Sequence, residues 1–165
     1  MDSVFYYDYP IGKLGIAESK GAIRGVFFSG PAFDRVNKKM TALAAETAVS
    51  ETALIKKAAG QLDEYFKGKR KTFDLPLAPE GTDFQKQVWE GLLGVPFGQC
   101  CTYKGIALSI GRPKASRAVG MAANRNPIVI IIPCHRMLGS NGSLTGFAGG
   151  LPVKQQLLDL ERQYA

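Results

Sequence analysis

The stretch TYKGIALSIGRPKASRAVGMAA, residues 102–123, has the pattern of two short helices joined by a tight turn. Thr102 can begin the first helix, whose inward positions are Ile106, Ala107 and Ile110. Gly111-Arg112-Pro113 interrupts the pattern, and the second helix is expected from about residue 113 to residue 123, because proline is tolerated in a first helical turn. Two short helices joined by a turn that contains glycine match a helix-turn-helix.

The second expected helix combines small and basic residues, as the run from Lys114 through Ala115 and Ser116 to Arg117 shows. A helix surface of this kind can approach a nucleic-acid backbone closely, as DNA-reading helices do. Small residues also let a helix pack tightly inside a protein core. The sequence of this helix leaves both interpretations open.

An apolar run, residues 128–132, follows and is expected to form a buried strand. It leads into Pro133, Cys134 and His135, the only histidine of the chain. Cysteine is a nucleophile as the thiolate, and a nearby histidine or arginine can lower the pKa of a thiol, so we expect His135 and Arg136 to have this effect. Adjacent side chains of a regular strand point to opposite faces, so contact between Cys134 and His135 would need a turn or a bridging water. The simpler interpretation is a buried cysteine beside a histidine that is satisfied in the core.

The end of the chain, residues 154–164, is expected to form a final helix. If that helix packs against the cysteine, either Asp159 or Glu161 can supply a carboxylate that orients His135. The glycines of residues 146–150 indicate a flexible loop before this helix.

Upstream of residue 102, Thr82 or Asp83 can cap a further helix. Its apolar stripe consists of Phe84, Val88, Trp89, Leu92 and Leu93. Proline and glycine residues indicate a linker over residues 75–82. We therefore expect an N-terminal domain of residues 1–77 and a C-terminal domain of residues 78–165.

The N-terminal part predicts strands over residues 4–9 and 14–28, with a hairpin turn at Ser19-Lys20-Gly21. A loop is expected over residues 30–41, and a helix over residues 42–66. The expected fold is an α/β N-terminal domain, with a small antiparallel sheet plus a helix, followed by a mostly α C-terminal domain with a helix-turn-helix.

The net charge of +7 is concentrated in the C-terminal half. Residues 84–165 hold 9 Lys/Arg and 3 Asp/Glu, whereas residues 1–83 hold 12 and 11. Such an excess favours a polyanionic partner, with nucleic acid first among them. A basic surface without a partner is the alternative.

The rest of the composition narrows the class of protein. The sequence has no apolar run as long as a membrane span and no export signal at its start, so we expect a cytoplasmic protein with no membrane partner. The three cysteines are then expected to be reduced. One histidine and no spaced cysteine cluster argue against a structural zinc site.

Several motifs resemble, in order, those of the O6-alkylguanine-DNA alkyltransferase family. The central one is Ile132-Pro133-Cys134-His135-Arg136. The others are Tyr65-Phe66 with Gly68, Phe73-Asp74-Leu75-Pro76-Leu77, Phe84-Gln85 with Val88-Trp89, Pro96-Phe97-Gly98, Thr102-Tyr103, Arg117-Ala118-Val119-Gly120, Asn126-Pro127, Gly149-Gly150-Leu151, and Leu157-Leu158 before Glu161. The resemblance is collinear from about residue 60 to residue 162 and weak over residues 1–59.

The resemblance implies DNA repair by direct reversal. An alkyl group would move from the O6 of a guanine in double-stranded DNA onto Cys134, with O4-alkylthymine as a second implied substrate. The transfer would be irreversible and stoichiometric, by a monomer that needs no metal and no cofactor. The family's helix-turn-helix binds the minor groove, and the damaged base is flipped out of the duplex.

The resemblance also implies roles for particular residues. Cys134 matches the nucleophile, His135 the base that acts through a water, and Glu161 the carboxylate that holds the histidine. Asn126 matches an asparagine that supports the site, and Tyr103 a tyrosine that hydrogen-bonds the flipped guanine.

Other matched residues concern DNA and the base pocket. Arg117 matches the arginine that fills the vacated place in the duplex, and the further residues expected at DNA are Thr102, Lys114, Ala115, Ser116 and Arg136. The expected pocket consists of Tyr103, Met137, Ser140, Phe147 and Ala148. The backbone carbonyls of Cys134 and Met137 would read the guanine amino group.

Three positions depart from the family pattern. Phe147 stands where a tyrosine is common, and Ala148 replaces a serine seen in some members. Cys100-Cys101 is not a usual family feature.

Three alternatives remain at this stage. One is a non-catalytic, alkyltransferase-like protein that binds alkylated DNA, although Cys134 argues against it. Another is a regulator that senses alkylation at Cys134. The third is a cysteine hydrolase, which would turn over repeatedly and would not need DNA.

Overall fold

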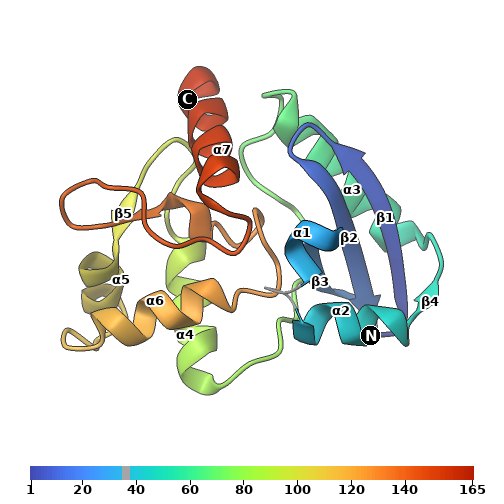
Figure 1. Cartoon of the computed structure of the whole chain (residues 1–165), viewed down its shortest axis with the longest axis horizontal. Coiled ribbons are helices and arrows are strands. Elements are labelled where there is room, and N and C mark those ends of the chain that lie inside the picture. Colours follow the sequence, from blue (N-terminus) through green and yellow to red (C-terminus); the bar gives the residue numbers. More distant parts are fainter. Residues whose placement is uncertain (35–37) are drawn as a thin grey trace. The chain divides into compact units, whose positions relative to one another are not determined.

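The computed structural model of the chain describes residues 1–34 and 38–165 (Figure 1). The chain divides into two compact units, Met1–Pro79 and Glu80–Ala165. The first unit holds a small β-sheet with helices. The second is mostly helical and contains the candidate site.

The sheet of the first unit has four strands in the order β3-β2-β1-β4. They are β1 (Ser3–Tyr9), β2 (Gly12–Ser19), β3 (Ala22–Phe28) and β4 (Ala48–Val49). The predicted hairpin turn is confirmed, since Lys20 and Gly21 have φ of 53° and 77°, as a two-residue hairpin loop requires. The sheet is mixed and not purely antiparallel as expected, because β4 pairs parallel to β1. The helices between β3 and β4 supply the crossover that a parallel strand needs.

Different helices cover the two faces of this sheet (Figure 1). Side chains alternate along β1, and Val4 packs with Met40 and Ala44 of α2 (Lys38–Ala45). On the opposite face, the Tyr9 hydroxyl donates to the Ala59 carbonyl of α3 (Ala53–Phe66) at 3.0 Å. The α/β fold expected for this part of the chain is therefore confirmed.

The helices of this unit differ from the expectation in two places. The loop expected over residues 30–41 is wrong where α1 (Pro31–Asp34) and the start of α2 lie, and its residues 35–37 fall outside the described residues. The single helix expected over residues 42–66 is interrupted between α2 and α3. Thr52 caps α3, its hydroxyl accepting from the Ile55 N–H at 3.2 Å, so a new helix begins there.

Part of the expected linker is tied to the sheet. The Ile23 N–H donates to Pro76 at 2.8 Å, and Ile23 accepts from the Ala78 N–H at 2.9 Å. Residues 76–78 thus lie along the edge of β3. A sheet edge tolerates proline, because a residue there does not have to donate to a second neighbouring strand.

The second unit begins with α4 (Asp83–Leu93), α5 (Tyr103–Ser109) and α6 (Ser116–Asn124), which pack against one another. Thr82 caps α4 in a reciprocal capping box with Gln85. Trp89 of α4 is buried and donates from Nε1 to the Ala122 carbonyl of α6 at 2.9 Å. The second helix of the pair begins three residues later than expected, because a turn closed by the Ala115 N–H on the Arg112 carbonyl precedes it.

The strand expected over residues 128–132 is not formed. Ile130 has a φ of 71°, and the Ile132 N–H donates to the Ile128 carbonyl at 3.0 Å, so the run folds back on itself. Its side chains are nonetheless buried. The apolar pattern therefore predicted correctly that these side chains are buried, but the extended backbone that was expected from it is wrong.

The remaining elements surround this turn. Cys134–Arg136 form the 3₁₀ helix η1, and β6 (Met137–Leu138) pairs parallel to β5 (Cys101–Thr102). The chain closes with α7 (Leu151–Tyr164), which packs against η1. Across the two described ranges, no helix is both long enough and apolar enough to cross a bilayer.

Candidate active site

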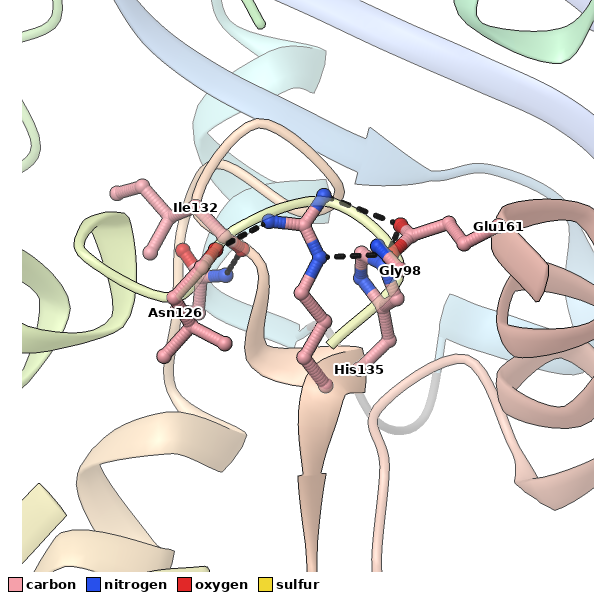
Figure 2. Close-up of polar contacts among 7 residues, drawn as sticks. Gly98, Asn126, Ile132, His135 and Glu161 are labelled. Carbon is pink, nitrogen blue, oxygen red and sulfur yellow. Dashed lines mark hydrogen bonds and ion pairs between the residues drawn. The ribbon is translucent and has the colours of Figure 1, made fainter. Parts of the chain in front are cut away.

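Asn126 holds the turn that presents Cys134. Its Nδ2 donates to the Ile132 carbonyl at 2.8 Å, as Figure 2 shows, and to Cys134 Sγ at 3.2 Å. Its Oδ1 accepts from the Ile128 N–H at 2.9 Å. The side chain is buried, so these bonds satisfy its amide away from water. One residue therefore connects the beginning of the turn to the sulfur at its end.

Cys134 is a buried thiol at the first position of η1. Burial raises its pKa to about 11, although the Asn126 amide, the charge of Lys154 and the backbone N–H groups of Cys134 and His135 act in the opposite direction. The thiol is therefore neutral at rest, and a base must remove its proton before the sulfur becomes a strong nucleophile.

His135, the neighbour of Cys134 in the chain, is the candidate for that base. Its ring is fully buried, and Nε2 lies 2.5 Å from Glu161 Oε2. Burial lowers the pKa of His135, so the ring is neutral near pH 7. A neutral ring that donates from Nε2 keeps a lone pair on Nδ1. This Nδ1 is buried and has no hydrogen-bond partner among the residues that the structure describes.

Glu161 of α7 is surrounded by donors (Figure 2). Its Oε1 accepts from Arg136 Nε at 2.8 Å and from the Gly98 N–H at 3.1 Å. Its Oε2 accepts from Arg136 Nη2 at 3.1 Å and faces His135. Gly98 has a φ of 78°, which favours glycine in the Pro96-Phe97-Gly98 motif. The motif thus helps to hold the carboxylate that orients the histidine.

Arg136 belongs to this network and not to a DNA-facing surface. Its side chain is buried, donates from Nη1 to the Val95 carbonyl at 2.6 Å and lies over the Phe97 ring. An arginine that contacts a phosphate or a base has to be accessible. The structure therefore does not support the expectation that Arg136 binds DNA, because its guanidinium balances the charge of Glu161 instead.

Tyr103 begins α5 and lies beside α6. A Cβ atom at Gly120 would lie 3.2 Å from Cε1 of the tyrosine ring, so the glycine lets the ring pack closely. The Tyr103 hydroxyl shares a hydrogen bond with the hydroxyl of Thr145. The tyrosine is thereby attached to the loop that precedes α7.

The other expected pocket residues divide into two groups. Met137 is buried directly after η1, whereas Phe147 and Ala148 are half-buried on the loop before α7. Ser140 lies in an exposed turn closed by the Gly142 N–H on the Gly139 carbonyl, and among the described residues no hydrogen bond joins it to the other expected pocket residues. The structure brings Met137 and Thr145 together through Lys154, whose Nζ donates to both of their carbonyls.

The residues expected at DNA lie mainly around the start of α6. Lys114 and Arg117 are exposed, and Ala115 and Ser116 are half-buried at the helix N-terminus. No side chain caps that terminus. Its first N–H groups are therefore left without a capping side chain, and this geometry suits an anion. Thr102 instead caps α5, accepting from the Gly105 N–H at 2.9 Å.

Sequence reasoning missed three residues of this site, namely Gly98, Thr145 and Lys154. A signal for Lys154 was present, since it falls on the helical stripe that continues through Leu157 and Leu158 to Glu161. Gly98 was marked only as part of the Pro96-Phe97-Gly98 motif, which does not reveal its backbone contact with Glu161, and nothing marked the hydroxyl of Thr145. Together the residues form a buried thiol beside a neutral histidine backed by a carboxylate, which is the arrangement of an activated nucleophile.

Two family models match the chain, one in each of its two parts. The family described as 6-O-methylguanine DNA methyltransferase, DNA binding domain, matches residues 83–163, and the ribonuclease-like domain of the same protein matches residues 5–79. The chain is 49% identical over 160 residues to the methylated-DNA–protein-cysteine methyltransferase of Methanosarcina barkeri, covering 94% of this chain and 96% of that protein.

Two further similarities are of the same kind. The constitutive methylated-DNA–protein-cysteine methyltransferase of Bacillus subtilis is 46% identical over 154 residues, covering 93% of this chain and 91% of its own. The crystal structure of Mycobacterium tuberculosis OGT in complex with DNA superposes with a TM-score of 0.86 at 36% identity, covering 99% of this chain and 94% of that one.

Proposed function

The chain belongs to the 6-O-methylguanine DNA methyltransferase family, and on that premise we propose that it repairs DNA by transferring an alkyl group from the O6 of guanine to its own Cys134. The observation that carries the choice of residue is the buried constellation of Cys134, His135 and Glu161 on η1 and α7. A protein that only binds alkylated DNA has no use for such a thiol.

The first step is removal of the thiol proton. His135 Nδ1 has an available lone pair, and we propose that a water carries the proton from Cys134 Sγ to it. The Glu161 carboxylate stabilises the imidazolium that results, because it already accepts the Nε2 hydrogen. The Asn126 amide and the nearby charge of Lys154 favour the thiolate over the thiol.

The second step is an in-line displacement at the alkyl carbon. A sulfur lone pair forms the S–C bond while the C–O6 bond breaks, and the electrons of that bond remain on the guanine. The Tyr103 hydroxyl donates to the leaving base and stabilises its developing charge. The base then takes a proton, and Cys134 is left as a thioether. No group in this mechanism cleaves the thioether, so each molecule acts once.

The reaction needs a guanine outside the duplex. We propose that α5 and α6 form a helix-turn-helix that enters the minor groove, with Arg117 filling the place of the flipped base. The exposed Lys114 and Arg117 and the uncapped N-terminus of α6 support this role. The M. tuberculosis relative, whose structure contains DNA, supports DNA as the partner.

Intact mass spectrometry tests the proposal directly. The protein is mixed with a duplex that contains one O6-methylguanine, and we expect a gain of one methyl group per molecule, located on the Cys134 peptide. Cys134→Ser should gain none, while Cys100→Ser and Cys101→Ser should behave like the parent. Repeated turnover, or a methyl group on Cys100 or Cys101, would show that the proposal is wrong.

A further inference from the structure

Lys154 is a buried cation with unusual partners. Only 1% of its surface is exposed, although it lies on α7 among apolar positions. Its Nζ donates to the Met137 carbonyl at 2.5 Å and to the Thr145 carbonyl at 3.1 Å. Within residues 1–34 and 38–165, no carboxylate forms an ion pair with it. A buried ammonium without a counter-charge is costly, so its retention calls for a reason.

The groups around Lys154 suggest that reason. The charged side chain that acts on Cys134 is Lys154 from α7, whereas the neighbouring His135 contributes its backbone N–H, and Lys154 also interacts with Cys101 and Cys100. Burial raises the pKa of Cys101 to about 11, so at neutral pH that thiol carries no charge. In the proposed reaction, a negative charge does form at Cys134. The Cys134 thiolate that forms in the proposed reaction is thus the negative charge that balances the ammonium group of Lys154.

The two acceptors of Lys154 belong to two different segments that carry residues of the expected pocket. Met137 follows η1 directly, so its carbonyl is fixed relative to Cys134. Thr145 lies on the loop that carries Phe147 and Ala148, and its hydroxyl meets that of Tyr103. One ammonium group therefore joins the backbone that directly follows η1 to the loop and, through Thr145, to the tyrosine.

We infer that Lys154 is a positioning residue for alkyl transfer: it fixes the Met137 and Thr145 carbonyls around the pocket, and its charge stabilises the Cys134 thiolate. The inference rests on the proposed function, in which Cys134 is the acceptor. It goes beyond that proposal by giving the cation two separable effects, one on the geometry of the pocket and one on the sulfur.

The test compares Lys154→Met, Lys154→Arg and a matched control, Lys86→Met, which removes an exposed lysine of α4. The first measurement is the rate at which iodoacetamide alkylates Cys134 between pH 7 and pH 10, followed on the Cys134 peptide. This reaction forms a thioether, releases iodide and needs neither DNA nor the base pocket. The second measurement is methyl transfer from the O6-methylguanine duplex under single-turnover conditions.

Lys154→Met should lower the iodoacetamide rate at a given pH by about tenfold for each unit by which the thiol pKa rises. Methyl transfer should fall further, because the carbonyls are also released. Lys154→Arg should keep the parent pH profile while losing part of the transfer rate. Lys86→Met should match the parent in both measurements.

The inference is overturned if Lys154→Met matches Lys86→Met in both measurements, or if Lys154→Arg shifts the pH profile as far as Lys154→Met does. If Lys154→Met fails to fold, the test rests on Lys154→Arg alone. Because arginine keeps the positive charge, a shifted pH profile of iodoacetamide alkylation in Lys154→Arg would contradict the inferred effect of that charge on Cys134. A parent protein that gains no methyl group from the duplex would contradict the proposed function instead, and the iodoacetamide measurement would still report on Lys154.

Discussion

Glu161 is the residue on which the site depends most. It receives Nε2 of His135 and two nitrogens of Arg136, and all three side chains are buried. Removing one partner from a buried charge pair leaves the other charge uncompensated, which costs far more than the loss of an exposed ion pair. The same carboxylate therefore supports the stability of the second unit and the basicity of the histidine.

Glu161→Gln should destabilise the second unit by about 3–5 kcal/mol, because Arg136 loses its counter-charge. It should also slow methyl transfer, because the imidazolium is no longer stabilised. Unfolding in denaturant can be followed by the fluorescence of Trp89, the only tryptophan of the chain. Asp159→Asn, an exposed change on the same helix, is the control, and equal unfolding midpoints for the two variants would contradict the prediction.

For individual residues of the candidate site, the sequence indicated Cys134, His135 and Glu161 but not all of the residues that contact them. The adjacency of Cys134 and His135 could be read directly, whereas the residues alone left Asp159 and Glu161 as alternatives and only the family resemblance selected Glu161. The surroundings of Arg136 could not, because its partners Val95 and Glu161 are distant in sequence and only tertiary packing buries them together. A basic residue in a basic protein resembles a DNA contact until its burial is known.

Among the elements, α6 carries the proposed contact with DNA. It buries Val119, Ala122 and Ala123 and exposes Arg117. The interpretation of its small residues as core packing is therefore confirmed on the buried face, and contact with DNA stays a prediction for the exposed face. Gly120 has a further role, since it accommodates the ring of Tyr103.

Arg117→Ala should lower methyl transfer from duplex DNA by at least about tenfold, or about 1.4 kcal/mol of transition-state stabilisation. Reaction with free O6-benzylguanine should change little, because no duplex has to be opened. The exposed Arg162→Ala on α7 is the control for loss of charge. Equal losses on both substrates would contradict the role of Arg117 in base flipping.

Most elements could be predicted from periodicity and capping residues, and the failures have physical reasons. Residues 128–132 are as apolar as a buried strand, but Asn126 supplies hydrogen bonds that a neighbouring strand would otherwise provide, so the backbone can turn. Residues 46–52 resembled helix because their apolar positions continue the pattern. Thr52 begins a new helix there, and β4 pairs with β1.

At the scale of the whole molecule, the buried titratable groups of the second unit set a window of pH for its stability. Burial lowers the pKa of His135 below its ordinary 6.5. As pH falls, His135 of the unfolded chain is therefore protonated before His135 of the folded chain, and the folded state loses stability below about pH 6.5. Burial raises the pKa of Cys134 from 9.0 to about 11. As pH rises, the Cys134 thiol of the unfolded chain therefore loses its proton before that of the folded chain, and the folded state loses stability above about pH 9.

The unfolding midpoint reported by Trp89 should therefore be highest between about pH 6.5 and pH 9. Cys134→Ser should make the alkaline limb shallower, because serine does not titrate in this range, and should leave the acid limb in place. The part of the alkaline limb that remains belongs to Cys101, whose pKa burial also raises to about 11. An alkaline limb that is unchanged in Cys134→Ser would show that another group causes it.

The hydrogen bond between Tyr103 and Thr145 has a consequence for how such a protein searches a genome. On the proposed mechanism, each molecule is consumed by one lesion and must first reject a great many intact guanines. A tyrosine whose hydroxyl is already satisfied gains little net free energy from exchanging Thr145 for a base, since one hydrogen bond replaces another. Intact guanines are then held only briefly, and the protein leaves them quickly. Selectivity arises from the chemistry that follows, because only an alkylated base offers the sulfur a carbon to attack.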